Sequence, residues 1–424
     1  MSLSHSTTRV SGAKNVDYFV PAQEPAAGTA LTKQSSGEDV PLLFKPLTIR
    51  GVTFPNRVWL SALDQYSSKD GSPSAWHLAH IGGIATRGPG LSIMECTAIQ
   101  ARGRITPEDA GIWDDRHIAE HKVITDFVHS QNQKIGIQLA HAGRKASTRA
   151  AWLQSSSFGV GLLVAEEDGG WPNDLIAPSA IAWSDKLGTP RAMTTEDIKD
   201  SVEDWKKAAQ RAVNAGFDVI ELHGAHGFLL NAFISPTSNK RTDQYGGSFE
   251  NRIRYPLEVI DAVRSVIPKD MPLFYRISAT EWCEKSLPNE PSWTVEDTVK
   301  FAGIIADHGV DLIDLSSGGN SQHQRVEPGH LYQVPFAAAV KKAHGDKILA
   351  AAVGGITNGN DAQRILTEGS ADITLVGRAF QKNPGTVWKF AEDLGVEIFM
   401  SHQMEWPYIG RGGSVTRRLP LPEA

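Results

Sequence analysis

Two histidines separated by two small residues, His223 and His226, follow an apolar run of the sequence. Their spacing supports three interpretations. Two imidazoles can donate hydrogen bonds that polarise a substrate oxygen, as in an oxyanion hole. They can instead be two zinc ligands, with Glu221 on the same strand face as a third. They can also be ordinary polar residues in a satisfied hydrogen-bond network.

A second chemical feature is a cation inside an apolar segment, Arg276 in the run 274–278. The interior of a barrel rarely holds an unpaired cation. Arg276 therefore needs either a carboxylate partner or an anionic ligand. The N1–C2=O edge of a flavin, which becomes negative when the flavin is reduced, is a ligand of that kind.

Two glycine-containing turns form the third feature, Gly354-Gly355 and Gly377-Arg378. Glycines let backbone N–H groups approach an anion closely, and Arg378 adds a positive charge. The turns follow the seventh and eighth apolar runs, where barrels usually bind phosphate. Ordinary tight turns are the alternative interpretation of the same residues.

These features lie at the ends of eight short apolar runs that alternate with longer amphipathic stretches. Short apolar runs that are largely uninterrupted by charge are typical of parallel strands covered on both faces. Capping boxes at Thr194-x-x-Asp197 and Thr294-x-x-Asp297 predict two of the helices, and a third is expected over 251–267. The pattern predicts an α/β fold of the (β/α)₈ TIM-barrel class. The expected strands are 57–61, 91–97, 134–139, 217–222, 273–277, 312–315, 348–353 and 373–376.

One connection, residues 142–193, is too long for a standard loop of this fold and carries three tryptophans. Long loops are often functional, and the tryptophans favour a folded cap near the barrel mouth over a surface excursion. We expect three parts of the chain: an irregular N-terminal arm over 1–40, a barrel over 41–400 and a C-terminal tail over 401–424.

Composition narrows the class of protein. The net charge is -6 and no basic patch occurs, so nucleic acid is not an expected partner. No run of about 18 apolar residues occurs, so no membrane span is expected. The chain has only 2 cysteines, far apart, which suits a reducing compartment and predicts a cytoplasmic location.

Three longer blocks resemble a known family. The most specific is 238–252, Ser-Asn-Lys-Arg-Thr-Asp-Gln-Tyr-Gly-Gly-Ser-Phe-Glu-Asn-Arg, and the blocks 103–106 and 135–145 agree with it. On these blocks and the His-x-x-His turn, the chain resembles the old yellow enzyme family from about residue 43 to about residue 384. Its similarity is greatest to the shorter, thermophilic-like branch. The resemblance disfavours the zinc interpretation, and no metal is expected.

The resemblance implies a non-covalent FMN that NADPH or NADH reduces, and a small substrate such as an α,β-unsaturated carbonyl compound. It implies that His223 and His226 hydrogen-bond the carbonyl or nitro oxygen of the substrate. It also implies that Gln138 and Arg276 face the pyrimidine edge of the flavin. The other implied FMN contacts are Ser61, Ala62, Leu63, Asp64, Cys96, Gly354, Gly355, Gly377 and Arg378. The other implied substrate contacts are Tyr66, Gly224, Ala225 and Phe228.

Four positions depart from the pattern of that family. Phe228 stands where a tyrosine usually donates a proton, and Ala62 stands where proline is usual. Asp64 stands where the branch usually has a cysteine, and an apolar site would raise its pKa into the range of a general acid or base. Trp406 stands after residues 403–405, where members often have an arginine that reaches a neighbouring subunit. A homodimer stays open, but that contact is not expected.

The missing tyrosine leaves three functions open. The first is an NAD(P)H-dependent reductase of an activated C=C bond, in which Asp64, Tyr66 or water protonates the α-carbon and the two histidines bind the oxygen. The second is a redox-neutral double-bond isomerase, or a desaturase of a specialised metabolite, with Asp64 as general acid and base. The third is a catalytically idle barrel that binds FMN or another ligand.

Overall fold

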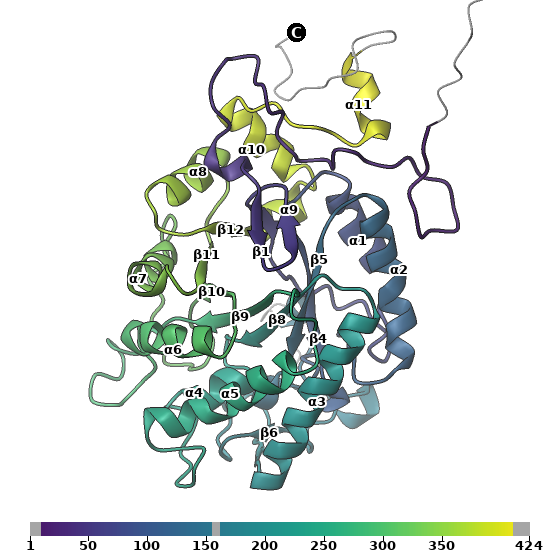
Figure 1. Cartoon of the computed structure of the whole chain (residues 1–424). Coiled ribbons are helices and arrows are strands. Elements are labelled where there is room, and N and C mark those ends of the chain that lie inside the picture. The colour runs from purple at the N-terminus through teal and green to yellow at the C-terminus, as the bar shows by residue number, and fades with distance from the viewer. Residues whose placement is uncertain (1–9, 155–161, 410–424) are drawn as a thin grey trace, which may run out of the picture.

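Eight parallel strands close into a barrel in the computed structural model, which describes residues 10–154 and 162–409 (Figure 1). The strands follow one another around the barrel in chain order, and the last pairs with the first. Each of the eight expected runs overlaps one of them, so the predicted (β/α)₈ fold is confirmed. The strands are β3 (Val58–Leu60), β4 (Ser92–Ala98), β5 (Ile135–Ala140), β8 (Val219–Gly224), β9 (Leu273–Ser278), β10 (Leu312–Ser316), β11 (Leu349–Val353) and β12 (Ile373–Val376).

Helices surround the barrel (Figure 1). Both expected capping boxes are formed, at Thr194 before α3 and at Thr294 before α6. The helix expected over 251–267 is α5, which begins earlier because the Ser248 side chain accepts a hydrogen bond from the Asn251 amide. The helices are α1 (Ala75–Ala85), α2 (Arg116–Ser130), α3 (Thr195–Asn214), α4 (Leu229–Ile234), α5 (Phe249–Arg264), α6 (Val295–Asp307), α7 (Val334–His344), α8 (Gly359–Thr367), α9 (Arg378–Lys382), α10 (Thr386–Leu394) and α11 (His402–Ile409).

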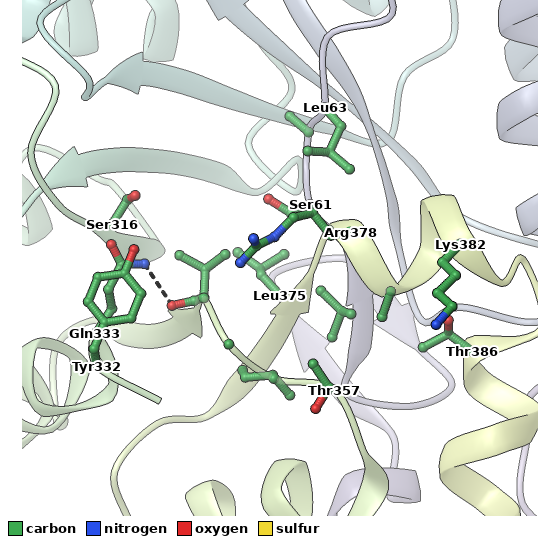
Figure 2. Close-up of a pocket in the computed structure, with 18 of the residues that line it drawn as sticks. Ser61, Leu63, Ser316, Tyr332, Gln333, Thr357, Leu375, Arg378, Lys382 and Thr386 are labelled. Carbon is green, nitrogen blue, oxygen red and sulfur yellow. Dashed lines mark hydrogen bonds between the residues drawn. The ribbon is translucent and has the colours of Figure 1, made fainter. Parts of the chain in front are cut away.

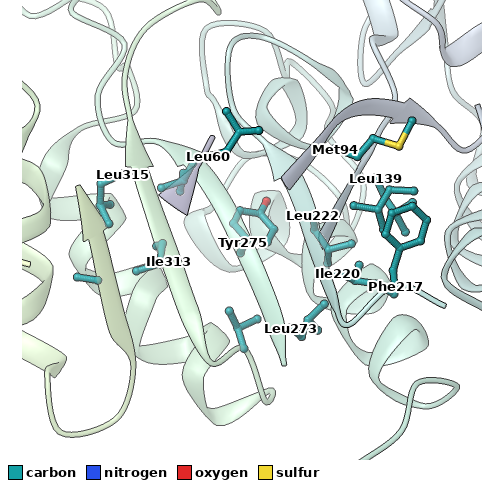
Figure 3. Packing of buried hydrophobic residues seen from close by; sticks show 14 of the residues in the cluster. Leu60, Met94, Leu139, Phe217, Ile220, Leu222, Leu273, Tyr275, Ile313 and Leu315 are labelled. Carbon is teal, nitrogen blue, oxygen red and sulfur yellow. The ribbon is translucent and has the colours of Figure 1, made fainter. Parts of the chain in front are cut away.

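The strands bury side chains on both faces. Outward residues such as Ile220, Leu222 and Ile313 pack against the helices in one large apolar cluster (Figure 3). Inward residues of the lower barrel form a second apolar cluster, in which Trp59 stacks on Phe274. The hairpin of β1 (Leu47–Ile49) and β2 (Val52–Phe54) also packs against this inner cluster. The inward positions toward the carboxyl ends of the strands are therefore the ones available for polar side chains.

The described residues of the long connection over 142–193 include two very short strands that pair in parallel, β6 (Ile176–Ala177) and β7 (Arg191–Ala192). The indole N–H of Trp183 donates to the Gly319 carbonyl at 2.9 Å, and the indole N–H of Trp171 donates to the Arg102 carbonyl at 2.9 Å. The connection is thereby bonded to loops that follow two other barrel strands. We propose that the connection forms a folded cap near the barrel mouth.

Part of the N-terminal arm, within its described residues, is bonded to the C-terminal segment. The Gly28 amide donates to the Phe399 carbonyl and the Phe399 amide donates to the Thr29 carbonyl, both at 2.8 Å. Gly28 has a φ of +79°, and a Cβ there would lie 1.9 Å from the Gly88 carbonyl oxygen. Only glycine fits this close approach. We propose residues 41–400 as the barrel domain, with the arm bonded along its C-terminal segment.

Candidate active site

A cavity of about 850 Å³ opens at the carboxyl ends of the barrel strands (Figure 2). This is the face where barrels of this class place their active sites. Its volume lies within the usual range for small-molecule sites. Among the residues proposed from sequence, those on its wall are Ser61, Ala62, Leu63, His226, Arg276, Gly354, Gly355, Gly377 and Arg378.

One end of the cavity combines glycine turns with positive charge. Gly354 and Gly355 have φ values of +99° and +75°, and a Cβ on Gly354 would lie 2.5 Å from the Nε2 atom of Gln333. That Gln333 nitrogen donates to the Val353 carbonyl at 2.9 Å, which braces the turn (Figure 2). Arg378 and Lys382 line the same cavity. Within the described residues neither cation has a carboxylate within ion-pair distance, so this end suits an anion.

Arg276 enters the barrel between two neighbouring strands. Its register partners are His223 on β8 and Asp314 on β10, so the three side chains lie at one level. The Arg276 Nε atom lies 3.0 Å from an Asp314 carboxylate oxygen, and its Nη1 donates to the Ser61 hydroxyl at 3.2 Å. Burial lowers the pKa of Arg276, but the charges of Asp314 and Glu221 outweigh burial and raise it. Asp314 is thus a carboxylate partner of Arg276, one of the two alternatives that the sequence left open.

A second carboxyl group, Glu221, completes this buried cluster. Its Oε1 accepts a hydrogen bond from Gln138 Nε2 at 2.7 Å, and its Oε2 has no partner among the described residues. Burial and the neighbouring Asp314 raise the pKa of Glu221 to about 8. Burial raises the pKa of Asp314 to about 6, against the effect of Arg276. At neutral pH the cluster therefore holds one proton between its two carboxyl groups, and its charge is balanced.

Gln138 links this cluster to the next strand. Its Oε1 accepts a hydrogen bond from the Cys96 thiol at 3.0 Å, while its Nε2 donates to Glu221. Burial raises the pKa of Cys96 well above its usual value, which keeps the thiol protonated and able to donate. An amide has two N–H groups, so one of Gln138 stays available for a ligand.

The two histidines lie together where β8 ends. Their ring centroids are 5.1 Å apart, and His226 Nε2 lies 2.8 Å from the Ser316 hydroxyl. His223 Nδ1 has no partner among the described residues. Burial lowers the pKa of both imidazoles well below the usual value, so both are neutral at physiological pH. His226 has a φ of +61°, an uncommon strained backbone that is frequent at functional sites.

Asp64 and Tyr66 follow β3 beside the cavity. The Asp64 carboxylate accepts a hydrogen bond from the Cys96 amide at 3.1 Å. Burial, together with Glu95, raises the pKa of Asp64 to about 7. Burial and Asp64 also raise the pKa of the Tyr66 hydroxyl, so Tyr66 stays protonated. The indole of Trp152, from the long connection, meets the Tyr66 ring edge-on at 5.5 Å between centroids.

The other expected substrate contacts, Phe228, Gly224 and Ala225, differ in what they contact. Phe228 meets the His223 ring edge-on at 5.1 Å and packs in an apolar cluster with Cys96. Ala225 is fully buried, and a Cβ on Gly224 would lie 2.1 Å from the Tyr275 hydroxyl. Neither Gly224 nor Ala225 is on the cavity wall. They support the turn that carries the histidines.

Lys145, the last residue of the block 135–145, also lies at this site. Lys145 Nζ donates to the His226 carbonyl at 2.8 Å and to the Gly319 carbonyl at 3.1 Å. Its ammonium also lies 5.4 Å from the centre of the Phe228 ring. Burial, and then the neighbouring Arg144, lower the pKa of Lys145 to about 8. Two adjacent cations, Arg144 and Lys145, shortly after the third strand were the available signal.

The donor set fits a flavin mononucleotide. The glycine turns and Arg378 could hold a phosphate, and the buried Arg276 and Gln138 could face the polar edge of a ring. Within the described chain, no group of three or more His, Cys, Asp or Glu side chains is arranged to hold a metal ion. Over that same part, no helix has the length and apolar character needed to cross a membrane.

Comparisons with known proteins agree with this geometry. A model of the NADH:flavin oxidoreductase / NADH oxidase family matches residues 42–397. An NADH:flavin oxidoreductase of Gibberella zeae is 51% identical over 415 residues, which cover 96% of this chain and 98% of that protein. The NADPH dehydrogenase of Bacillus subtilis is 42% identical over 359 residues, which cover 84% of this chain and 96% of that protein.

Solved structures give the same result. Morphinone reductase superposes with a TM-score of 0.67 at 29% identity, covering 84% of this chain and 91% of that one. The resemblance drawn from the sequence blocks is confirmed, as are FMN and NAD(P)H as cofactors. The chain belongs to the NADH:flavin oxidoreductase / NADH oxidase family, the old yellow enzymes, and is an FMN-dependent oxidoreductase.

Proposed function

We propose that this enzyme reduces an electron-poor C=C bond next to a carbonyl group, with NADPH or NADH as electron donor. The observation that carries the proposal is the pair of neutral imidazoles, His223 and His226, at the level of Arg276 beside the main cavity. A neutral imidazole donates one hydrogen bond without demanding an anionic ligand. Such a pair suits an oxygen that gains negative charge only in the transition state.

The cavity residues take complementary binding roles in this proposal. When bound, FMN supplies a hydride that can be stored and passed on. Arg276, Gln138 and Ser61 orient the polar edge of its ring, and Arg378 binds its phosphate. The further proposed contacts to FMN are Ala62, Leu63, Asp64, Cys96, Gly354, Gly355 and Gly377.

Reduction of an enone places a hydride on the β-carbon and a proton on the α-carbon. Phe228 has no proton to give. Asp64 and Tyr66 are the proposed donors, because burial raises the pKa of both groups, to about 7 for Asp64, and both follow the segment that lines the cavity. We propose that Asp64 is the principal one, since a pKa of about 7 matches the operating pH of a general acid.

The test of this function is spectroscopic. The purified yellow holoenzyme should lose its flavin absorbance when NADPH or NADH is added without oxygen. Addition of 2-cyclohexenone should then restore it, with one saturated ketone formed per nicotinamide oxidised. A flavin that is bleached but not re-oxidised by any enone would contradict the proposed substrate class.

A second candidate function, redox-neutral isomerisation, is favoured by one observation. Asp64, with a pKa of about 7, can both give and take a proton at neutral pH. An isomerase would exchange deuterium from D₂O into an enone while oxidised flavin absorbance and nicotinamide stay constant. A desaturase would bleach the flavin with a saturated ketone instead.

We also propose a cytoplasmic enzyme, with a homodimer as the assembly to test. Both cysteines are free thiols in the described structure, which is consistent with a reducing compartment. Trp406 stands at the position where an arginine would be expected to reach a neighbour. Sedimentation of the holoenzyme would decide between monomer and dimer.

A further inference from the structure

A second cavity, of about 330 Å³, lies beside the active site and shares no lining residue with the main one. Four segments enclose it: the long connection at 144 and 181–183, the segment after α4, the loop after β9 and the loop after β10. The established family activity gives it no role. Its lining residues with polar or charged side chains include Arg144, Thr237, Lys240, Glu290, Asn320 and His323.

The wall of this cavity contains a buried guanidinium group without a carboxylate in contact. Arg144 is only 4% exposed. It donates to the Asn320 carbonyl at 2.7 Å, the Asn320 side-chain oxygen at 3.0 Å and the Ile181 carbonyl at 3.3 Å, while its Nε has no partner among the described residues. The nearest compensating charge, Glu281, bonds to the Asn320 side-chain nitrogen instead. A buried cation bound only to neutral oxygens is costly unless an anion joins it.

The other lining residues leave the net charge of this cavity positive. Lys240 and His323 lie on the exposed rim, and Glu290 is the one carboxylate among the described lining residues. None of these three takes part in an ion pair within the described structure. Next to Arg144 along the chain is Lys145, a second, largely enclosed cation whose hydrogen-bond partners are carbonyl groups.

This cavity is physically connected to the active-site turn. Gly319 precedes Asn320, and its carbonyl accepts hydrogen bonds from Lys145 Nζ at 3.1 Å and from the Trp183 indole at 2.9 Å. The same Lys145 ammonium holds the His226 carbonyl. A Cβ on Gly319 would lie 2.5 Å from the His226 α-carbon, so the two loops are in direct contact. The loop that packs against the histidine turn therefore also lines this cavity.

We propose that this cavity binds a phosphate group of the nicotinamide dinucleotide that reduces the flavin. The inference rests on the proposed function, in which that dinucleotide docks beside the histidines. Arginine suits phosphate because its planar fork matches two phosphate oxygens, and Lys240 adds a mobile charge at the rim. The phosphate comes from the 2′-position of NADPH or from the pyrophosphate that NADPH and NADH share.

The test uses the double variant Lys240→Ala/His323→Ala of the FMN-loaded enzyme, with Lys207→Ala, an exposed lysine of α3, as the matched control. The rate of flavin bleaching is measured against NADPH and NADH concentration to obtain each apparent Kd. Calorimetric titration of the oxidised holoenzyme with adenosine 2′,5′-bisphosphate and with inorganic phosphate gives a second readout that needs no turnover. The control should leave every value unchanged.

We expect the double variant to raise the apparent Kd for NADPH about tenfold, in line with the loss of charge-assisted phosphate contacts. A rise for NADPH and adenosine 2′,5′-bisphosphate alone assigns the 2′-phosphate, and equal rises for NADPH and NADH assign the pyrophosphate. Unchanged affinity for both nucleotides overturns the proposal, as does a loss confined to the enone. If the wild-type flavin resists both nucleotides, the proposed function fails, and the calorimetry still decides whether phosphate binds here.

To separate a binding role of Arg144 from a structural one, Arg144→Lys keeps the charge but removes the fork. We expect weaker binding of adenosine 2′,5′-bisphosphate together with an unchanged flavin spectrum. Full-strength binding in a folded Arg144→Lys enzyme would contradict a phosphate contact through the guanidinium fork.

Discussion

Replacement of Asp64 by asparagine tests the proton transfer proposed for this site. Asparagine keeps the shape and the oxygen that accepts the Cys96 amide hydrogen bond, but it cannot exchange a proton. General acid catalysis contributes roughly 10²–10⁴ in rate, and Tyr66 or water replaces part of that. We therefore expect Asp64→Asn to lower enone turnover at least about tenfold.

The pH dependence of turnover follows from the same group. The folded-state pKa of Asp64 is raised from 3.8 to about 7, so the acid form is present below pH 7 and lost above it. Wild-type turnover, if limited by this proton, should fall as pH rises through about 7. The Asp64→Asn enzyme should show no inflection there.

The free energy of unfolding provides a second, independent test of the raised pKa of Asp64. A raised carboxyl pKa means that the folded state binds the proton more tightly than the unfolded state, so stability is lost as pH rises from the unfolded value through about 7. Three pKa units correspond to about 4 kcal/mol, and partial exposure of Asp64 reduces this to roughly 2 kcal/mol. Asp64→Asn should thus be more stable than the wild type by about 2 kcal/mol at pH 8.5, and by less at pH 4.5.

The assays are NADPH consumption with 2-cyclohexenone across pH 5.5–9 and urea unfolding at the two pH values. Asp200→Asn, at an exposed position of α3, is the matched control and should change neither. Turnover within twofold of wild type, with the same pH profile, would refute Asp64 as a proton donor.

Three further predictions concern the cavity. Phe228→Tyr should speed flavin re-oxidation by cyclohexenone in stopped-flow measurements, because it adds a proton donor beside His223, whereas Phe228→Leu should not; no gain from tyrosine would argue against a simple reductase. Arg276→Gln should destabilise the apoprotein by about 3–5 kcal/mol, since it leaves Asp314 buried without its cation, and should weaken FMN binding by fluorescence titration; an unchanged urea midpoint would contradict the ion pair. Gly354→Ala should weaken FMN binding at least about tenfold, because its Cβ would displace Gln333, while Gly369→Ala, with open space around it, should strain the backbone but spare FMN affinity; equal FMN affinities would remove the turn from the phosphate site.

The site was only partly accessible from sequence, and the reason is visible in Arg276. An arginine in an apolar strand implied a buried partner, but Asp314 lies 38 positions further along the chain, in an equally apolar run. Only the register of β9 against β10 brings the two to one level. Glu221 was considered as a zinc ligand; its bond to Gln138 depends in the same way on the register of β5 against β8.

The amino-acid sequence alone determined the barrel, because eight short, largely apolar runs alternating with capped amphipathic stretches have few other ways to bury their apolar faces. It also determined which polar residues gather at one end, since parallel strands end on the same face. The tertiary structure decided which charges pair. It also decided that Gly224 and Ala225 stay off the wall of the main cavity and that Arg144 lines a separate cavity. These outcomes depend on strand register and loop packing between distant segments, where a shift of one residue turns a side chain to the opposite face.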